Sequence, residues 1–383
     1  MDVRLLWLAL GAFAGSVESS LIVGVLPAIA AETGVSLAQA GYLIFGYSIA
    51  YGIGTPLLST LFGHLDRRTV VAGAELLFGL MCLLLGVLPG FLLLVLARTF
   101  MALGAGLFTS TAQATAVALA APGKRGSAIS TVVMGGSIAV AVGVPAAALV
   151  AEFLGWRVAY LGLGVLAIIA SATMWLKLPA DIHGDRRTIR ERLSVLRVPG
   201  MPLTLLTSGV MVMASFTFFN YLAPITTDLL GLERVLLPLV MFAFGIGAVF
   251  GNFFGGRLAD RIGGRQTMLV IGGLMVVLLA AVPLLALLPR PLVLPAFLVH
   301  MALYGVVSWG FFPPQLHRLA ALAPLAVPLS ASLNLTSMNI GGALSALVGG
   351  LVLENLSIAW LGPIGAIGAV AALVIAYLAP DHR

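Results

Sequence analysis

Apolar runs long enough to cross a membrane follow one another along almost the whole chain. The runs at 76–87 and 269–288, for example, show no regular alternation of apolar and polar residues. In hydrocarbon, every backbone donor and acceptor must pair within the protein, so only helices and closed barrels can span it. The strands of a barrel would alternate with a period of two. The pattern therefore predicts an all-α membrane protein.

Composition supports the same fold class. Of the 383 residues, 61% are apolar and only 9% are charged, whereas a soluble domain carries about 25% charged residues. The single cysteine, Cys82, lies inside an apolar run, so neither a disulfide nor a cysteine metal cluster is expected. We expect no metal and no other cofactor.

The apolar runs divide into twelve predicted transmembrane helices, each near the roughly twenty residues that a span needs. The predicted spans are 5–30, 38–62, 69–88, 91–118, 127–150, 157–177, 202–227, 235–256, 267–288, 292–315, 327–352 and 358–379. The longest polar interruption, 179–200, is predicted to be a cytoplasmic linker. It separates an N-terminal six-helix half, 1–178, from a C-terminal six-helix half, 201–383.

The distribution of positive charge predicts the orientation of these spans. With the N-terminus inside, only Arg157, Arg234 and Arg290 fall outside, Arg98 falls within a span, and the remaining sixteen of the 20 Lys and Arg residues fall inside. Positive charge is retained on the cytoplasmic side of membranes. We therefore expect both termini in the cytoplasm. The same bias accounts for the net charge of +6 and argues against nucleic acid as a partner.

Two loops repeat one pattern six predicted spans apart. The first, at 63–68, reads G-H-L-D-R-R, and the second, at 255–265, reads G-G-R-L-A-D-R-I-G-G-R. Each combines glycine, one aspartate and clustered arginines. Internal repeats of this kind are typical of secondary transporters, so the sequence predicts two pseudo-symmetric halves.

On these residues the chain resembles the major facilitator superfamily. The second loop matches the family's signature between spans two and three nearly in full, and the first loop is an abbreviated copy. Span four carries Leu96-Ala97-Arg98 followed by two glycines, which resembles the family's arginine motif. Span five carries Gly143-Val144-Pro145 and is followed by Gly155-Trp156-Arg157, which resembles the motif of drug:proton antiporters, and the opening segment resembles arabinose-efflux-like exporters.

The resemblance implies a multi-pass protein of the bacterial inner membrane that acts as a monomer on a small-molecule substrate and on protons. It also implies that spans five and eight pack against each other across the two halves. Small residues recur in these spans, and they are predicted to form a sliding surface or, alternatively, a tight static contact. The residues concerned are Gly136, Gly143, Gly247, Gly251 and Gly255.

Two charged residues well inside spans are the strongest candidates for proton coupling. Glu18 lies near the middle of the first span, where a charge costs at least ~2.5–3.5 kcal/mol on insertion scales and low dielectric favours the neutral acid. Arg98 cannot lose its proton, so it needs an anionic, carbonyl or water partner. The alternatives are a neutral acid hydrogen-bonded to a neighbouring helix for Glu18 and a fixed clamp between helices for Arg98.

Two further titratable groups lie within spans. Glu75, in span three, is predicted to form a structural ion pair near the loop with Arg67 and Arg68, and the alternative is a part in proton transfer. His300, in span ten, can titrate near neutral pH, but a lone histidine is more often a hydrogen-bonded core residue.

The remaining candidates are polar or aromatic residues that could line a substrate cavity. Tyr47 and Tyr51 are four residues apart and so share one helix face, either as a cavity wall or as plain packing. Each asparagine is either a ligand contact or a link between helices. The predicted substrate-binding set is Glu18, Tyr47, Tyr51, Asn220, His300, Asn334 and Asn339.

The repeated loops are predicted to gate the transporter. In this hypothesis each aspartate forms a salt-bridge latch that holds one conformation, and the alternative is topological charge alone. The predicted gating residues are Asp66, Arg67, Arg68, Asp260, Arg261 and Arg265.

The leading functional prediction is a proton-coupled antiporter that exports a drug-like compound, sugar or metabolite by alternating access. An importer or facilitator on the same fold is the alternative. An enzyme is not expected, since no His, Asp and Ser constellation and no metal-ligand spacing is present. The chain also lacks a Walker pattern, so ATP drive within it is not expected.

Overall fold

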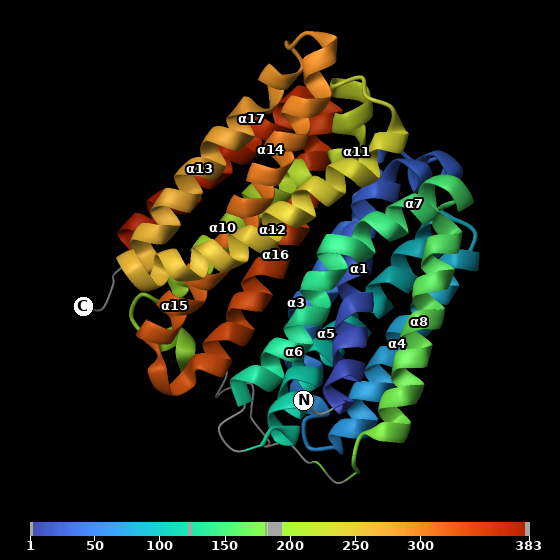
Figure 1. The fold of residues 1–383 in the computed structure, drawn as a ribbon, viewed down its shortest axis with the longest axis vertical. Helices are drawn as coiled ribbons and strands as arrows, with labels where there is room; N and C mark the ends of the chain where they lie inside the picture. The colour runs from blue at the N-terminus through green and yellow to red at the C-terminus, as the bar shows by residue number, and fades with distance from the viewer. Residues whose placement is uncertain (1–2, 122–124, 181, 183–193, 380–383) are drawn as a thin grey trace. The chain divides into compact units, whose positions relative to one another are not determined.

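The computed structural model describes residues 3–121, 125–180, 182 and 194–379, and all regular structure in these residues is helical (Figure 1). The predicted linker 179–200 falls largely outside the described residues. From the N-terminus the elements are α1 Arg4–Thr33, α2 Leu37–Ala40, α3 Tyr42–Leu61, α4 Arg67–Val87, α5 Phe91–Leu119, α6 Arg125–Ile138, η1 Ala139–Gly143, α7 Val144–Leu154 and α8 Trp156–Lys177.

The second part of the chain is helical as well. Its elements are η2 Val195–Arg197, α10 Met201–Phe219, α11 Leu222–Pro224, η3 Ile225–Leu229, η4 Arg234–Leu236, α12 Leu237–Ile262, α13 Gly264–Leu285, α14 Arg290–Gly310, α15 Phe312–Leu322, η5 Pro324–Ala326, α16 Val327–Asn355, η6 Ile358–Trp360 and α17 Leu361–Leu378.

Eleven helices in the described residues are long and apolar enough to cross a membrane. The multi-pass helical fold predicted from the apolar runs is therefore confirmed, and the count of twelve remains a prediction. The predicted second span, 38–62, contains α3. This helix has 20 residues but is not among the eleven, because its tyrosines, serines, threonines and proline lower its hydropathy.

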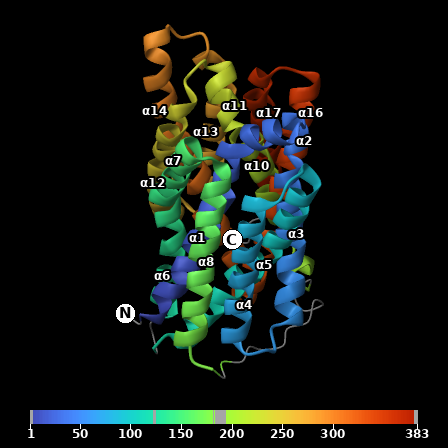
Figure 2. The same cartoon turned by 90° about the vertical axis from the view of Figure 1, so that its right-hand side faces the viewer.

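The chain divides into two compact units. The first comprises the described residues of Met1–Val35 and Gly46–Ile189, and the second those of Ser36–Phe45 and Arg190–Arg383. In the first unit α1 packs on α6, α7 and α8, and α4 packs on α5 and α8. Figure 2 shows α4, α5 and α8 side by side.

In the second unit α10 packs on α16 and α17, and α13 packs on α14 and α17. The short helix α2, which belongs to this unit, packs on α16. Its end lies beside Tyr221, whose hydroxyl donates a hydrogen bond to the carbonyl of Ala346 at 2.9 Å. The two units therefore share a packing pattern. In each unit the first span contacts the fifth and sixth spans, and the third span contacts the fourth and sixth spans.

Glycines set the distance between α12 and α14. A Cβ added at Gly247, Gly251 or Gly255 would lie 1.9, 2.2 or 2.3 Å from the carbonyl oxygens of Ala302, Val306 and Gly310, respectively. Both series advance four residues at a time, so the two helices run parallel with their backbones in contact. These three glycines face α14 inside their own unit, which agrees with the alternative of a tight contact between helices.

The glycines of span five likewise face their own unit. A Cβ at Gly143 would lie 2.5 Å from Val17 of α1, and one at Gly136 would lie 3.0 Å from the hydroxyl of Ser16. Between these points the helix passes through the π-helical turn η1. Pro145 follows it and has no N–H to continue the hydrogen-bond ladder. The wider turn brings α6 and α7 along one side of α1.

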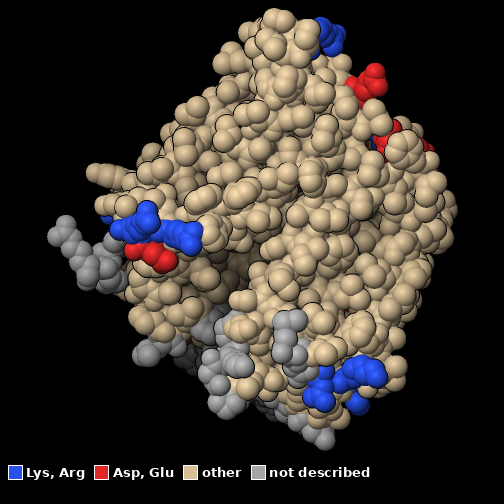
Figure 3. Space-filling model, in the orientation of Figure 1, with Lys and Arg blue, Asp and Glu red and all other residues tan. Residues whose placement is uncertain are grey.

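The outer faces of the helices are apolar. Leu92, Leu176 and Leu287 are 70%, 75% and 80% exposed, as expected for apolar side chains that contact lipid. On the face shown in Figure 3, Lys, Arg, Asp and Glu lie near helix ends and the helix sides carry none.

The glycine contact between α12 and α14 generates a first prediction. Gly251→Ala should destabilise the protein by about 1–3 kcal/mol, because the added methyl group overlaps a backbone oxygen that cannot move away cheaply. Gly273→Ala on α13 is the matched control, since a Cβ there has no neighbour within 4 Å. Thermal unfolding in detergent should show a lower midpoint for Gly251→Ala and an unchanged or higher one for Gly273→Ala. Equal midpoints for the two variants would contradict the close contact.

Candidate functional site

A buried ion pair joins α1 to α5 in the first unit. The Arg98 Nη1 atom lies 3.0 Å from Glu18 Oε1, and the two side chains are 2% and 0% exposed. The structure therefore brings together the two residues that were predicted for proton coupling. The Glu18 carboxylate is the anionic partner that the buried Arg98 guanidinium requires.

Tyr160, at the start of α8, closes a triangle with this pair. Its hydroxyl accepts a hydrogen bond from Arg98 Nη1 at 2.9 Å and donates one to Glu18 Oε1 at 3.3 Å. Tyr160 was not predicted as a site residue. The available signal was the requirement that a buried arginine find more than one acceptor, but the sequence does not identify which helix supplies it.

Tyr47 on α3 covers the other side of the arginine. The guanidinium carbon of Arg98 lies 4.9 Å above the Tyr47 ring, within the range of a cation–π interaction. Tyr47 also stacks on Tyr51, with 6.0 Å between ring centroids and 29° between the ring planes. The two tyrosines share one face, as their spacing predicts, and that face is adjacent to the ion pair.

The ion pair keeps unused hydrogen-bonding capacity. Glu18 Oε2 and Arg98 Nε are buried and have no hydrogen-bond partner among the described residues. A buried pair gains over desolvation only when its remaining lone pairs and protons are satisfied. Glu18 Oε2 is therefore free to accept a proton or a hydrogen bond, and Arg98 Nε–H is free to donate a hydrogen bond to water or to an acceptor group of a ligand.

The packing of α1 fixes where Glu18 points. Val17 contacts Gly143, and Phe13, one turn earlier, lies against the same glycine. Because these contacts occupy the α6–α7 side of the helix, the next residue along, Glu18, faces α5 and α8. Gly143 thus positions the carboxylate by letting the π-helical turn approach α1.

Glu75 differs from its predicted role. It is 1% exposed, its Oε1 atom has no hydrogen-bond partner, and it makes no ion pair with any described residue. Arg67 instead donates a hydrogen bond to the carbonyl of Ala114, and Arg68 lies 3.9 Å from Asp66. The predicted ion pair is wrong, because Glu75 points into the helix bundle rather than toward the helix end that carries the arginines.

His300 is a buried residue of the second unit. Its ring lies 6.1 Å from that of Phe218 and 6.4 Å from that of Phe297, and its Nε2 atom has no partner among the described residues. One turn further along α14, the Tyr304 hydroxyl lies 2.6 Å from Ser215 Oγ. Whether His300 contacts substrate stays a prediction.

The three predicted asparagines all make hydrogen bonds. Asn220 Nδ2 donates to Ser345 Oγ at 2.9 Å, and Asn334 Oδ1 accepts from Ser208 Oγ at 2.5 Å, so both link α10 to α16. Asn339 Nδ2 donates to the carbonyl of Leu335 on its own helix at 2.8 Å. These bonds account for the asparagines structurally, and ligand contact remains a prediction.

A small cavity of about 50 Å³ lies inside the second unit. Its lining is mainly aromatic and includes Phe216, Phe219, Phe244, Tyr304 and Trp309. The space suits a water molecule rather than a drug-sized ligand. None of the predicted substrate-binding residues lines it.

The two repeated loops differ in their contacts. Asp66 caps α4, since its Oδ1 atom accepts a hydrogen bond from the backbone N–H of Arg68 at 3.3 Å. Asp260 makes no ion pair in the described part of the chain, and Arg265 donates a hydrogen bond to the carbonyl of Tyr377. Gating by Asp260, Arg261 and the other loop residues stays a prediction.

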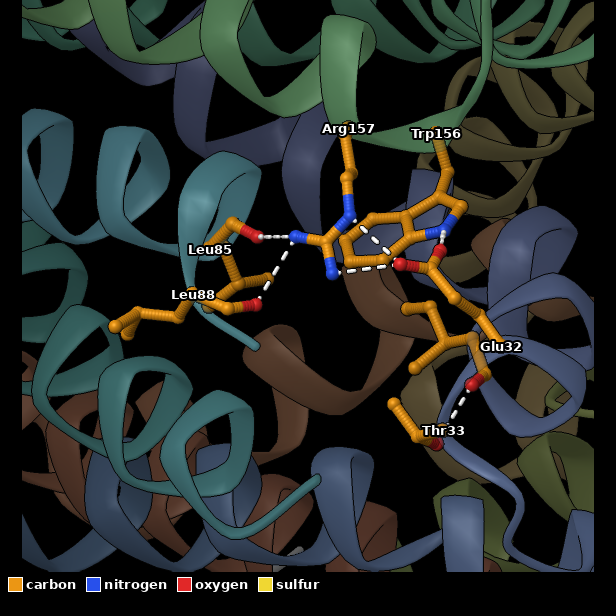
Figure 4. Close-up of polar contacts among 7 residues, drawn as sticks. Glu32, Thr33, Leu85, Leu88, Trp156 and Arg157 are labelled. Carbon is orange, nitrogen blue, oxygen red and sulfur yellow. Dashed lines mark hydrogen bonds and ion pairs between the residues drawn. The ribbon is translucent and has the colours of Figure 1, made fainter. Parts of the chain in front are cut away.

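A charged cluster ties three helices together at the far end of α1 (Figure 4). Arg157 lies 2.7 Å from Glu32 Oε1 and donates hydrogen bonds to the carbonyls of Leu85 and Leu88. The Trp156 indole donates to Glu32 Oε2 at 2.7 Å. The sequence placed Arg157 outside the membrane and in the Gly155-Trp156-Arg157 segment of the family resemblance, but it did not single out Glu32 as its partner. The cluster joins the end of α1 to α8 and satisfies the last carbonyls of α4.

This cluster generates the second prediction. Arg157→Lys keeps the charge but loses the planar fork that reaches Glu32 and two carbonyls at once. The expected loss of stability is about 1 kcal/mol, because both charged side chains are partly exposed and screened. Arg261→Lys, at an exposed position on α12, is the control. The midpoint of thermal unfolding in detergent should be lower for Arg157→Lys and unchanged for the control. An equal decrease in the control would contradict a specific contribution of the Arg157 guanidinium.

Comparison with known proteins places the chain in a family. The family model of the Major Facilitator Superfamily matches residues 8–327. The chain is 32% identical over 381 residues to the inner membrane transport protein YdhP of Escherichia coli strain K12, covering 99% of this chain and 96% of that protein. It is 28% identical over 379 residues to a chloramphenicol resistance protein of Streptomyces lividans, covering 98% and 95%.

A solved structure supports the fold. The crystal structure of a bacterial homologue of the human lysosomal transporter Spinster, in an inward-facing and unoccupied conformation, has a TM-score of 0.75. It covers 99% of this chain and 95% of its own, at 16% identity. With the family match and the 32% identity over nearly the full length, the chain belongs to the major facilitator superfamily of membrane transporters.

Proposed function

We propose that the chain is a proton-coupled antiporter that exports a small molecule by alternating access. It has twelve transmembrane helices in two six-helix halves, 1–178 and 201–383, joined by a cytoplasmic linker. The buried Glu18–Arg98 pair, with Tyr160 bonded to both residues, is the observation that carries this proposal.

The chemistry of coupling follows from the charges of this pair. An ionised Glu18 holds Arg98 at 3.0 Å, and protonation of the carboxylate removes the anion. The guanidinium then retains a charge that needs water, a carbonyl or an anionic group. Protonation therefore changes which arrangement of α1, α5 and α8 is stable. A ligand that favours one of these arrangements is coupled to the proton.

The surroundings of the pair suggest the substrate class. Tyr47 and Tyr51 offer stacked aromatic faces beside Arg98, which suit a lipophilic compound with an aromatic ring. The relative named for chloramphenicol resistance supports outward transport of compounds of this kind. His300 and the asparagines Asn220, Asn334 and Asn339 are the proposed polar contacts from the second unit.

The twelve-helix arrangement draws support from both parts of the chain. The same pairings of first, third, fourth, fifth and sixth spans recur in each unit. The range predicted for the second span contains α3, a 20-residue helix without a charged residue. An even number of spans places both termini on one side of the membrane, and the arginine bias makes that side the cytoplasm.

The third prediction tests the coupling site. Glu18→Gln mimics the protonated acid and cannot ionise, so proton-driven accumulation should fall to the level of vesicles without a pH gradient. The assay is uptake by inverted vesicles of a compound panel that includes chloramphenicol. Arg98→Ala should lose coupling as well, because it removes the group that responds to the proton.

Glu233→Gln is the matched control, since Glu233 is an exposed acid outside the spans and should transport like the unmodified protein. Uphill transport by Glu18→Gln at the normal rate would place the coupling proton on another residue. Loss in Arg98→Ala alone would leave Glu18 as a substrate contact.

The fourth prediction concerns topology. A reporter fused after Arg383 should report a cytoplasmic location. Twelve spans return the chain to the side of the membrane where it began. Fusions at the loop near Arg290 should give the opposite signal. A periplasmic signal from the Arg383 fusion would exclude the twelve-span arrangement.

A further inference from the structure

The second buried acid of the first unit, Glu75, lies in surroundings opposite to those of Glu18. Glu18 has a guanidinium at 3.0 Å, whereas Glu75 has no cation and its Oε1 atom has no hydrogen-bond partner among the described residues. Both side chains are at most 1% exposed. One carboxyl is thus compensated by a charge and the other is not.

The backbone of α1 packs against the carboxyl group of Glu75 in this conformation. An ideal Cβ at Gly11 of α1 would lie 3.1 Å from the carboxyl carbon of Glu75 and 2.5 Å from the ring of Phe108 on α5. Gly11 therefore lets the α1 backbone close over the acid. Toward the end of α4 that carries the arginines, an apolar cluster surrounds the helix and includes Leu8, Val71 and Ala112.

The titratable groups on the neighbouring helices are engaged elsewhere or lie nearer the helix ends. On α5, Arg98 binds Glu18, and on α8, Tyr160 binds the same pair. On α4 itself, Arg67 binds the carbonyl of Ala114 and Arg68 pairs with Asp66. The full set on these helices is Arg4, Glu18 and Glu32 on α1, Arg67, Arg68 and Cys82 on α4, Arg98 on α5, and Arg157, Tyr160 and Lys177 on α8, of which Glu32 and Arg157 pair with each other.

An ionised carboxyl in this place would be a buried charge without a partner. Such a charge costs several kcal/mol even after relaxation, and in proteins the group takes up a proton instead. For Glu18 the same cost is reduced by Arg98 at 3.0 Å. The geometry therefore favours an anion on Glu18 and a proton on Glu75 in this conformation.

We propose that Glu75 is a second proton-binding site of the transporter, which holds a proton while Gly11 packs against it and releases that proton to water when α1 separates from α4 and α5. This inference rests on the proposed proton-coupled function and adds a site to it. Release converts the acid to a carboxylate and one proton passes to the entering water, so the step needs no other reactant.

The link between the two acids is α1. Gly11 and Glu18 are seven residues apart, which is about two turns or 10 Å along one helix face. A shift of α1 that admits water to Glu75 therefore also changes the distance of Glu18 from Arg98. Proton release at one site and rearrangement of the ion pair at the other become parts of one movement.

Infrared spectroscopy of the full-length protein in lipid nanodiscs tests this proposal without any substrate. The probe is the carbonyl stretching band of an un-ionised carboxyl group at neutral pH. We expect the band in the unmodified protein and in Glu18→Gln, and its loss in Glu75→Gln. Persistence of the band in Glu75→Gln, or its loss in Glu18→Gln, would overturn the assignment.

Release of the proton is tested by raising the pH. The band should disappear from the spectrum of the unmodified protein. The midpoint of thermal unfolding of the unmodified protein should also fall more steeply with rising pH than that of Glu75→Gln, which cannot ionise. A band that persists to the highest pH at which the protein stays folded would make Glu75 a static neutral acid and overturn the release step.

A second variant covers the case in which Glu75→Gln does not fold. Glu75→Asp keeps a carboxyl on a shorter side chain and should shift the band, and an unshifted band would place the proton elsewhere. The coupling assay of Glu18→Gln fails or succeeds independently of these spectra, so the two proposals are judged by separate measurements.

Discussion

The ion pair between Glu18 and Arg98 determines how three helices of the first unit meet. Each charge alone would be costly in a membrane, and each finds its partner only when α1 and α5 present the correct faces to each other. Tyr160 extends the requirement to α8, because its hydroxyl both accepts from the arginine and donates to the carboxylate. A single buried pair therefore fixes the rotation of helices that apolar packing alone would leave loosely specified.

Glycine contacts supply the close approach that such polar contacts need. Apolar side chains gain little by leaving lipid for a protein interior, so helices in membranes associate through tight backbone packing. Gly251 on α12 and Gly143 beside α1 show the same solution in the two units. In the first unit, the approach at Gly143 sets the direction of Glu18, so packing of this kind also positions a functional group.

Sequence predicted the depth of residues in the membrane better than the direction in which they point. The apolar runs located the spans, and the rarity of charges within them singled out Glu18 and Arg98. The expected ion pair of Glu75 was wrong because nearness in sequence to Arg67 says nothing about which helix face the acid occupies. The contribution of Tyr160 could not be predicted either, because it depends on the relative rotation of α1, α5 and α8, which one sequence without structure does not define.

The two ends of α1 are held by interactions of different kinds. At one end Glu32 is fixed by Arg157 and Trp156 through charge-assisted hydrogen bonds in a partly exposed place, and such bonds tolerate water. At the other end Gly11 is held by van der Waals contact with Phe108 and with a carboxyl that stays buried only while it carries a proton. Entry of water opposes the second contact far more than the first. We therefore expect α1 to pivot about its Glu32 end, with Glu18 between the pivot and the end that opens.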